Sequence, residues 1–187
     1  LNGLAAALGG GQPLPTLSLV LPMGISFYTF QAMGYLIDVY WGKCPAERSL
    51  GRFALFVTFF PQLIQGPISR FGDLSRTLYA EHPWDSRQIA MGAERVLWGL
   101  AKKLIVADRL AIPLRTLVSD PDQYRGVYVL AVIFLYAVQL YADFTGGIDI
   151  TIGAAQMLGV RVTENFQRPF FSKNAAEYWR RWHITMG

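Results

Sequence analysis

The chain has 187 residues, of which 52% are hydrophobic and only 16% are charged, whereas a typical soluble domain has about 25% charged residues. This composition predicts a membrane protein. The net charge of +4 does not indicate nucleic-acid binding, because the basic residues lie between long apolar runs, where the positive-inside rule of membrane topology accounts for them.

One cysteine and two histidines allow neither an internal disulfide nor a four-ligand zinc site, so no metal is expected. The chain begins with Leu1 instead of Met, and residues 184–187 continue a helical pattern. We therefore expect the middle of a longer protein, with residues 1–187 forming a single partial membrane domain that lacks its N-terminal and C-terminal parts.

The first apolar segment covers residues 14–41 and carries no charge before Asp38. It exceeds the roughly 20 residues that a membrane-spanning helix needs, and Pro22 and Gly24 are expected to kink it. Three polar side chains in this segment share one helical face. They either bond to neighbouring helices or line a substrate path; they are Tyr28, Gln31 and Tyr35.

The second apolar segment, residues 53–64, has only about a dozen residues and is broken by Pro61. It is too short to span a bilayer, so we expect it to be re-entrant. His82 lies beside Pro83 in the hydrophilic stretch that follows, and we interpret it as an ordinary loop histidine.

Residues 89–118 alternate apolar and charged side chains. This pattern predicts an interfacial amphipathic helix that then crosses the membrane protected inside a bundle. Residues 127–142 contain no charge and form the strongest spanning candidate. Asp143 and Asp149 follow, and they either face a polar cavity or a partner, or act as helix caps at the interface. The pair Gly146-Gly147 is expected to break this helix.

The stretch NFQRPFFSKNAAEYWRRWH, residues 165–183, concentrates basic and aromatic residues directly after the apolar segment. Asn174 and Glu177 have the spacing of a helix-capping pair. Continued helical spacing would place Trp179, Trp182 and His183 on one face. His183 is then a buried structural histidine, part of a Trp/Arg interfacial belt, or a general base.

Four ordered blocks carry a resemblance to a known family: residues 21–42, 59–70, 141–160 and 165–184. Together they resemble the membrane-bound O-acyltransferase (MBOAT) family, in particular its bacterial branch that acetylates alginate and other exopolysaccharides. The branch that transfers D-alanine to teichoic acid is also similar, but its motif at this site resembles WNRWH. This chain has WRRWH there, so Arg180 favours the exopolysaccharide branch.

The resemblance implies an all-α, polytopic integral membrane bundle with re-entrant and interfacial helices, in the cytoplasmic membrane. A tunnel would join an intracellular acyl thioester, similar to acetyl-CoA, to the hydroxyl of an extracytoplasmic polysaccharide. The resemblance implies no bound cofactor. It implies contact with membrane lipid and with acyl-transfer partner proteins on the extracytoplasmic side of the membrane. His183 matches a histidine that the family requires for activity, and a second important histidine normally lies further along.

Further roles follow as hypotheses from this resemblance. Trp179 and Trp182 would wall the tunnel, Arg180 would meet an anionic donor or a carboxylate, and Asp143 and Asn165 would orient polar groups nearby. The alternatives are a polytopic transporter or flippase, since broken helices and intramembrane carboxylates also mark substrate pathways, and a noncatalytic scaffold in a polysaccharide-secretion complex.

Overall fold

The computed structural model describes residues 24–63, 65–119 and 123–186, and all regular structure in these ranges is helical. Part of the first predicted span, including Pro22, lies outside the described residues. Gly24 precedes the first described helix with a left-handed backbone, φ 81°. The all-α expectation is confirmed for the described part of the chain.

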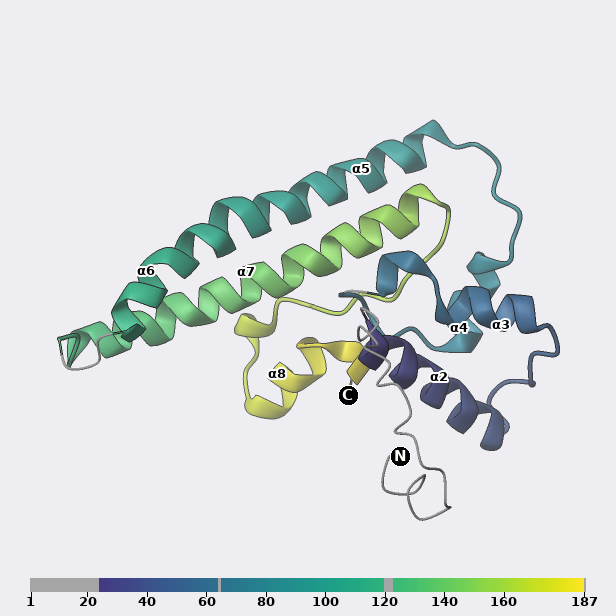
Figure 1. Cartoon of the computed structure of the whole chain (residues 1–187), viewed down its shortest axis with the longest axis horizontal. Helices are drawn as coiled ribbons and strands as arrows, with labels where there is room; N and C mark the ends of the chain where they lie inside the picture. Colours follow the sequence, from purple (N-terminus) through teal and green to yellow (C-terminus); the bar gives the residue numbers. More distant parts are fainter. Residues whose placement is uncertain (1–23, 64, 120–122, 187) are drawn as a thin grey trace, which may run out of the picture.

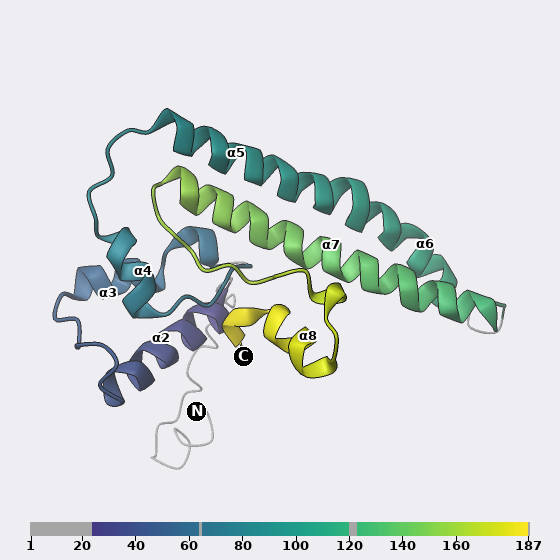
Figure 2. The ribbon, with the colours of Figure 1, turned by 180° about the vertical axis from the view of Figure 1, so that it is seen from behind.

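The helices form a long hairpin and a group of shorter helices beside it (Figure 1). In the hairpin, α5 (Ser86–Ala101), the π-helical segment η2 (Lys102–Ala107) and α6 (Asp108–Ser119) run along α7 (Val127–Met157). The view from behind shows the same pairing (Figure 2). The shorter elements are α2 (Ile25–Tyr40), α3 (Leu50–Val57), η1 (Phe60–Gln62), α4 (Phe71–Leu78), η3 (Pro169–Phe171), α8 (Ala175–Arg181) and η4 (Ile184–Met186).

Glycines let α5 and α7 approach closely. A Cβ at Gly99 would lie 2.6 Å from the carbonyl oxygen of Gly146, and a Cβ at Gly153 would lie 2.6 Å from that of Gly92. A Cβ at Gly147 would collide with the side chain of Gln65. The predicted break at Gly146-Gly147 is therefore wrong: α7 is continuous through this pair, because its glycines serve close packing of neighbours.

Charged side chains of the α5–η2 segment turn toward carboxylates on α7. Lys102 Nζ lies 2.5 Å from Asp149 Oδ2, and Lys103 Nζ lies 2.5 Å from Asp143 Oδ1. The wider turn of the π-helix allows two consecutive lysines to reach the same neighbour. Asp143 and Asp149 thus face partners in the middle of a helix, which contradicts their alternative reading as helix caps.

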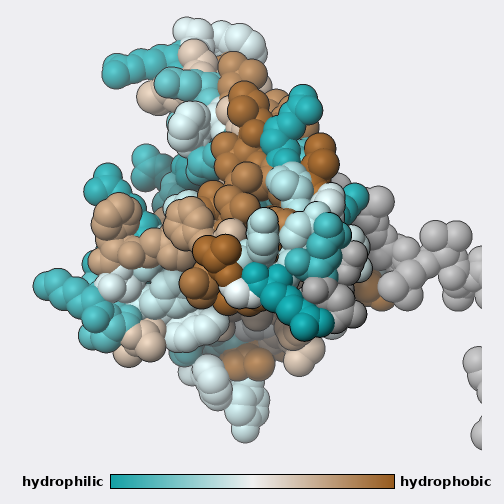
Figure 3. Space-filling model, turned by 90° about the vertical axis from the view of Figure 1, so that its left-hand side faces the viewer, coloured by the Kyte–Doolittle hydropathy of each residue, from teal (hydrophilic) through white to brown (hydrophobic). Residues whose placement is uncertain are grey.

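Among the described helices, only α7 is both long and apolar enough to cross a membrane. Its 31 residues give a length of about 46 Å, against roughly 30 Å for the hydrocarbon core. Large apolar side chains such as Val127, Leu130 and Phe134 are exposed on it. Figure 3, seen from the left-hand side of Figure 1, shows hydrophobic side chains gathered through the centre of that face.

The shorter helices pack around an aromatic core. Phe56 is fully buried, and its ring lies edge-on to that of Phe71 at 5.0 Å; Tyr35 packs against the same ring at 4.8 Å. The Tyr35 hydroxyl accepts a hydrogen bond from the Glu47 backbone N–H at 2.7 Å. Because α3 has only 8 residues, the prediction that this segment does not span is consistent with the structure.

Candidate active site

A cavity of about 540 Å³ lies where the start of α2 meets the end of the described chain. Figure 1 shows this meeting of the purple and yellow ends of the colour scale. Phe27, Phe30 and Ile184 give the cavity an apolar wall, and His183 contributes the imidazole. The cavity therefore combines apolar surface with a titratable group, as small-molecule sites commonly do.

His183 occupies a turn and not a helix face. The helix α8 ends at Arg181, Trp182 is extended, and His183 has a left-handed backbone with φ 49°. The predicted common face of Trp179, Trp182 and His183 is therefore wrong. The capping prediction is confirmed, because Asn174 Oδ1 accepts a hydrogen bond from the Glu177 N–H at 2.8 Å. A left-handed residue other than glycine costs about 1–2 kcal/mol, so the fold must hold this turn in place.

The surroundings of the His183 ring favour the neutral imidazole. The ring stacks on Phe144, with centroids 5.1 Å apart, and Phe166 lies edge-on to it. Nδ1 is buried and has no hydrogen-bond partner among the described residues. Burial lowers the pKa of His183 below its ordinary value of 6.5, because desolvation disfavours the charged form.

A buried row of amides and a hydroxyl borders the cavity. Gln31 Nε2 donates to Gln62 Oε1 at 3.3 Å and to the carbonyl oxygen of Phe56 at 3.1 Å. Gln62 Nε2 donates to Ser69 Oγ at 2.6 Å. The expectation that the polar stripe of α2 bonds to neighbouring elements is confirmed for Gln31. Since Gln31 and Ser69 also line the cavity, the row provides polar groups that can orient a ligand.

An ion pair lies at another part of the cavity lining. Asp38 is buried, and its two carboxylate oxygens accept hydrogen bonds from one Arg70 nitrogen at 2.9 and 3.1 Å. The Arg70 side chain is 61% exposed. Asp38 thereby keeps its charge satisfied inside the fold, and Arg70 still presents cationic surface.

The remaining predicted site residues lie outside the cavity lining. Trp179 is 65% exposed, Arg180 is exposed, and Asp143 pairs with Lys103. Trp182 packs in an aromatic cluster, stacked on Tyr178 with centroids 5.6 Å apart. Their assignment to a tunnel remains a prediction. His183 lines this cavity, as do Gln31 and Tyr35 from the predicted polar stripe of α2.

Asn165 lies beneath the His183 turn. It is fully buried, and its Oδ1 accepts hydrogen bonds from the backbone N–H and the hydroxyl of Thr185 at 2.9 and 3.0 Å. Its backbone carbonyl accepts a hydrogen bond from the N–H of Ile184 at 3.0 Å. Asn165 therefore contacts the segment that carries His183, and its predicted role in orienting polar groups at the site stays a prediction.

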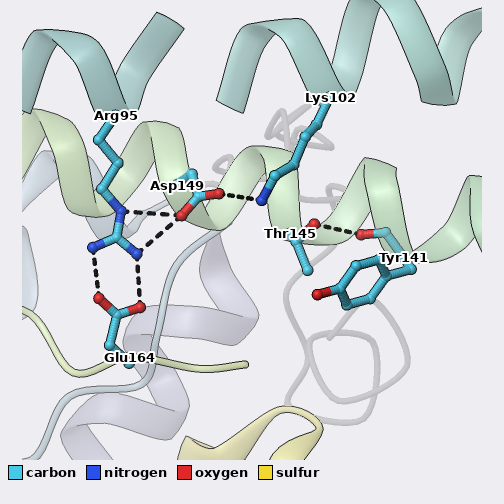
Figure 4. A network of polar contacts seen from close by, with 6 residues as sticks. All are labelled: Arg95, Lys102, Tyr141, Thr145, Asp149 and Glu164. Carbon is cyan, nitrogen blue, oxygen red and sulfur yellow. Dashed lines mark hydrogen bonds and ion pairs between the residues drawn. The ribbon is translucent and has the colours of Figure 1, made fainter. Parts of the chain in front are cut away.

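A network of charges secures the loop that carries Asn165 (Figure 4). Arg95 donates to Asp149 Oδ1 at 2.9 and 3.0 Å and also binds both carboxylate oxygens of Glu164. Lys102 completes the network by pairing with Asp149. Because Glu164 directly precedes Asn165, this network ties the loop to α5 and α7.

Several cavity residues were not identified from the sequence as site residues. Asp38 had a detectable signal, because it extends the spacing of Gln31 and Tyr35 along the same face of α2. Ser69, Arg70 and Thr185 had none, since they reach the cavity from segments far apart in the sequence. Only tertiary packing brings them together.

Comparison with known proteins bears on this site. The sequence profile of the MBOAT, membrane-bound O-acyltransferase family matches residues 48–187. A probable alginate O-acetylase of Azotobacter vinelandii is 41% identical over 193 residues, which cover 100% of this chain and 37% of the relative. A peptidoglycan O-acetyltransferase of Helicobacter pylori is 32% identical and a teichoic acid D-alanyltransferase of Streptococcus thermophilus is 28% identical, each matched over 91% of this chain. The chain spans 37% and 42% of the lengths of these two relatives.

Proposed function

Because the chain belongs to the membrane-bound O-acyltransferase family, we propose that it contributes His183 to the acyl-transfer site of a polytopic membrane enzyme. The observation that carries this proposal is a desolvated imidazole, with Nδ1 buried, in the wall of a 540 Å³ cavity. The proposed reaction moves an acetyl group from a thioester, similar to acetyl-CoA, toward a hydroxyl of a polysaccharide outside the cytoplasm. The alginate O-acetylase name of the relatives at about 40% identity supports acetyl over D-alanyl as the group transferred.

The proposed chemistry needs one base and one electrophile. Neutral His183 accepts the proton of the acceptor hydroxyl at Nε2, and the hydroxyl oxygen attacks the thioester carbonyl carbon. The carbon–sulfur bond then breaks, and the thiolate takes the proton from the imidazolium and leaves as a thiol. Gln31 and Ser69 also line the cavity and would orient the reacting groups, which would favour the reaction by holding them in an attack geometry.

The other parts of the proposal concern the whole protein in the cytoplasmic membrane. The thioester would arrive from the cytoplasm, and partner proteins on the far side would pass the acyl group to the polysaccharide. Arg180 and the exposed Trp179 would meet the donor or the membrane surface. Support for a membrane location comes from the family and from α7.

The proposal is tested with membranes that contain the full-length protein. Membranes from a strain lacking the gene, with and without the gene restored, are supplied with radiolabelled acetyl-CoA and isolated surface polysaccharide. The expected result is acetyl label on the polymer, together with an increase of one acetyl mass per modified residue, only where the gene is present. Equal labelling in both membranes would contradict the proposal. If the restored gene instead led to D-alanyl addition to teichoic acid, the group transferred would be D-alanyl and not acetyl.

The lowered pKa of His183 predicts how activity depends on pH. The reaction uses the neutral imidazole, and burial keeps that form populated below the ordinary pKa of 6.5. Activity should therefore persist as the pH falls through 6.5 and be lost at a lower pH, where the folded site takes up a proton. The value of kcat/KM measured against pH checks this, and an acid limb centred above 6.5 would contradict it.

A further inference from the structure

The left-handed turn at His183 depends on the residues that follow it. A residue other than glycine holds a positive φ, here 49°, only when the surrounding structure enforces it. The Met186 N–H donates to the His183 carbonyl oxygen at 2.9 Å and closes the turn locally. A local bond of this kind does not fix the turn relative to the cavity, so contacts with other segments must do so.

Thr185 supplies these contacts through one side chain. Its hydroxyl donates to Asn165 Oδ1 at 3.0 Å and accepts a hydrogen bond from the backbone N–H of Ile68 at 3.1 Å. Its own backbone N–H donates to the same Asn165 oxygen at 2.9 Å. The hydroxyl thus joins the His183 turn to the loop after α7 and to the segment between η1 and α4.

Both anchors of Thr185 are themselves held. Asn165 is fully buried, and the neighbouring Glu164 binds Arg95 through both carboxylate oxygens. Ile68 lies beside Ser69, whose hydroxyl accepts a hydrogen bond from buried Gln62. A displacement of Thr185 would therefore break bonds to two anchored segments at once.

From these contacts we propose that Thr185 is a positioning residue, which with Asn165 sets the orientation of the His183 imidazole in the cavity. The expected effect of Thr185 on acyl transfer rests on the proposed function. Its role in orienting His183 rests on the hydrogen bonds alone. Thr185 lines the cavity, but its hydroxyl is engaged as donor and acceptor within the protein. It therefore acts through His183 and not on the substrate.

The test compares replacements of Thr185 in the full-length protein. Thr185→Val removes the hydroxyl and keeps the branched shape of the side chain, and Thr185→Ala removes both. Two variants without the hydroxyl are used so that the result does not depend on one replacement. Thr185→Ser retains the hydroxyl. Thr116→Val is the matched control, because exposed Thr116 on α6 bonds only within its own helix, to the Ile112 carbonyl oxygen.

Two readouts are measured. The first is kcat and KM for acetyl transfer: loss of the hydroxyl is expected to lower kcat about 10- to 100-fold with KM little changed, as for a misplaced catalytic group. The second is the rate at which diethyl pyrocarbonate, which reacts with neutral imidazole, modifies His183 at a series of pH values, followed by peptide mass spectrometry. In the Val and Ala variants the ring should react faster, with a midpoint shifted upward toward 6.5.

The serine variant and the Thr116 control should match the wild type in both readouts. Wild-type kcat and an unchanged His183 modification profile in the Val and Ala variants would overturn the inference, as would a serine variant that behaves like valine. A changed modification profile in a protein whose wild type transfers no acyl group would uphold the positioning role and refute the proposed function.

Discussion

Replacement of His183 by glutamine in the full-length protein is expected to reduce acetyl transfer by about 10²- to 10⁴-fold, the contribution typical of a general base. Glutamine retains a polar side chain but cannot accept the hydroxyl proton at neutral pH. The loss should appear mainly in kcat, because the cavity that would bind the donor remains. Label transferred to polysaccharide per minute is the measurement.

His82→Gln is the matched control for this variant. His82 is exposed, and its Nε2 lies 2.6 Å from the carbonyl oxygen of Thr77, away from the cavity lining. Transfer by the His82 variant should equal that of the wild type. A His183 variant that retained the wild-type rate would refute the role of His183 as the base.

Replacement of Asp149 by asparagine is expected to lower the free energy of unfolding of the full-length protein by about 1–3 kcal/mol. The Asp149 side chain is only 13% exposed and accepts hydrogen bonds from both Arg95 and Lys102. The asparagine carries no negative charge, so these two partly buried cations lose the carboxylate that joins them to α7. Unfolding in detergent micelles, followed by helical circular dichroism against denaturant, measures the loss.

Glu94→Gln is the control for the electrostatic argument. Glu94 neighbours Arg95 on α5 but is exposed, and exposed substitutions commonly change stability by less than about 0.5 kcal/mol. If Asp149→Asn and Glu94→Gln had equal effects on unfolding, the ion network would not be what holds the hairpin and the Asn165 loop together.

The sequence predicted local features of the site well. Asn174 caps α8, as its spacing from Glu177 indicates, and Glu177 pairs with Arg181 at 2.5 Å. Both interactions connect residues within one helical turn, so sequence distance determines whether they can form. The apolar run that became α7 was likewise recognisable from its composition.

Features set by contacts between distant segments were not predictable in this way. Gly146 suggested a break, yet it permits close packing against Gly99. The helical spacing of Trp179 and His183 suggested a common face, yet α8 ends at Arg181 and Trp182 is extended, paired with the backbone of Phe166. Tertiary contacts outweigh local periodicity at both places, and they also bring Thr185 to Asn165 and Ile68.

In the proposed mechanism, His183 meets the reacting acyl group inside this cavity. The most direct measurement is an experimental structure of the full-length protein with a non-hydrolysable analogue of an acyl thioester. We expect the analogue to bind in the cavity, with its acyl group beside the His183 ring and space for an acceptor hydroxyl within hydrogen-bonding distance, about 2.6–3.2 Å, of Nε2. An analogue bound at a separate site, with its acyl group out of reach of His183, would refute the role of His183 as the base.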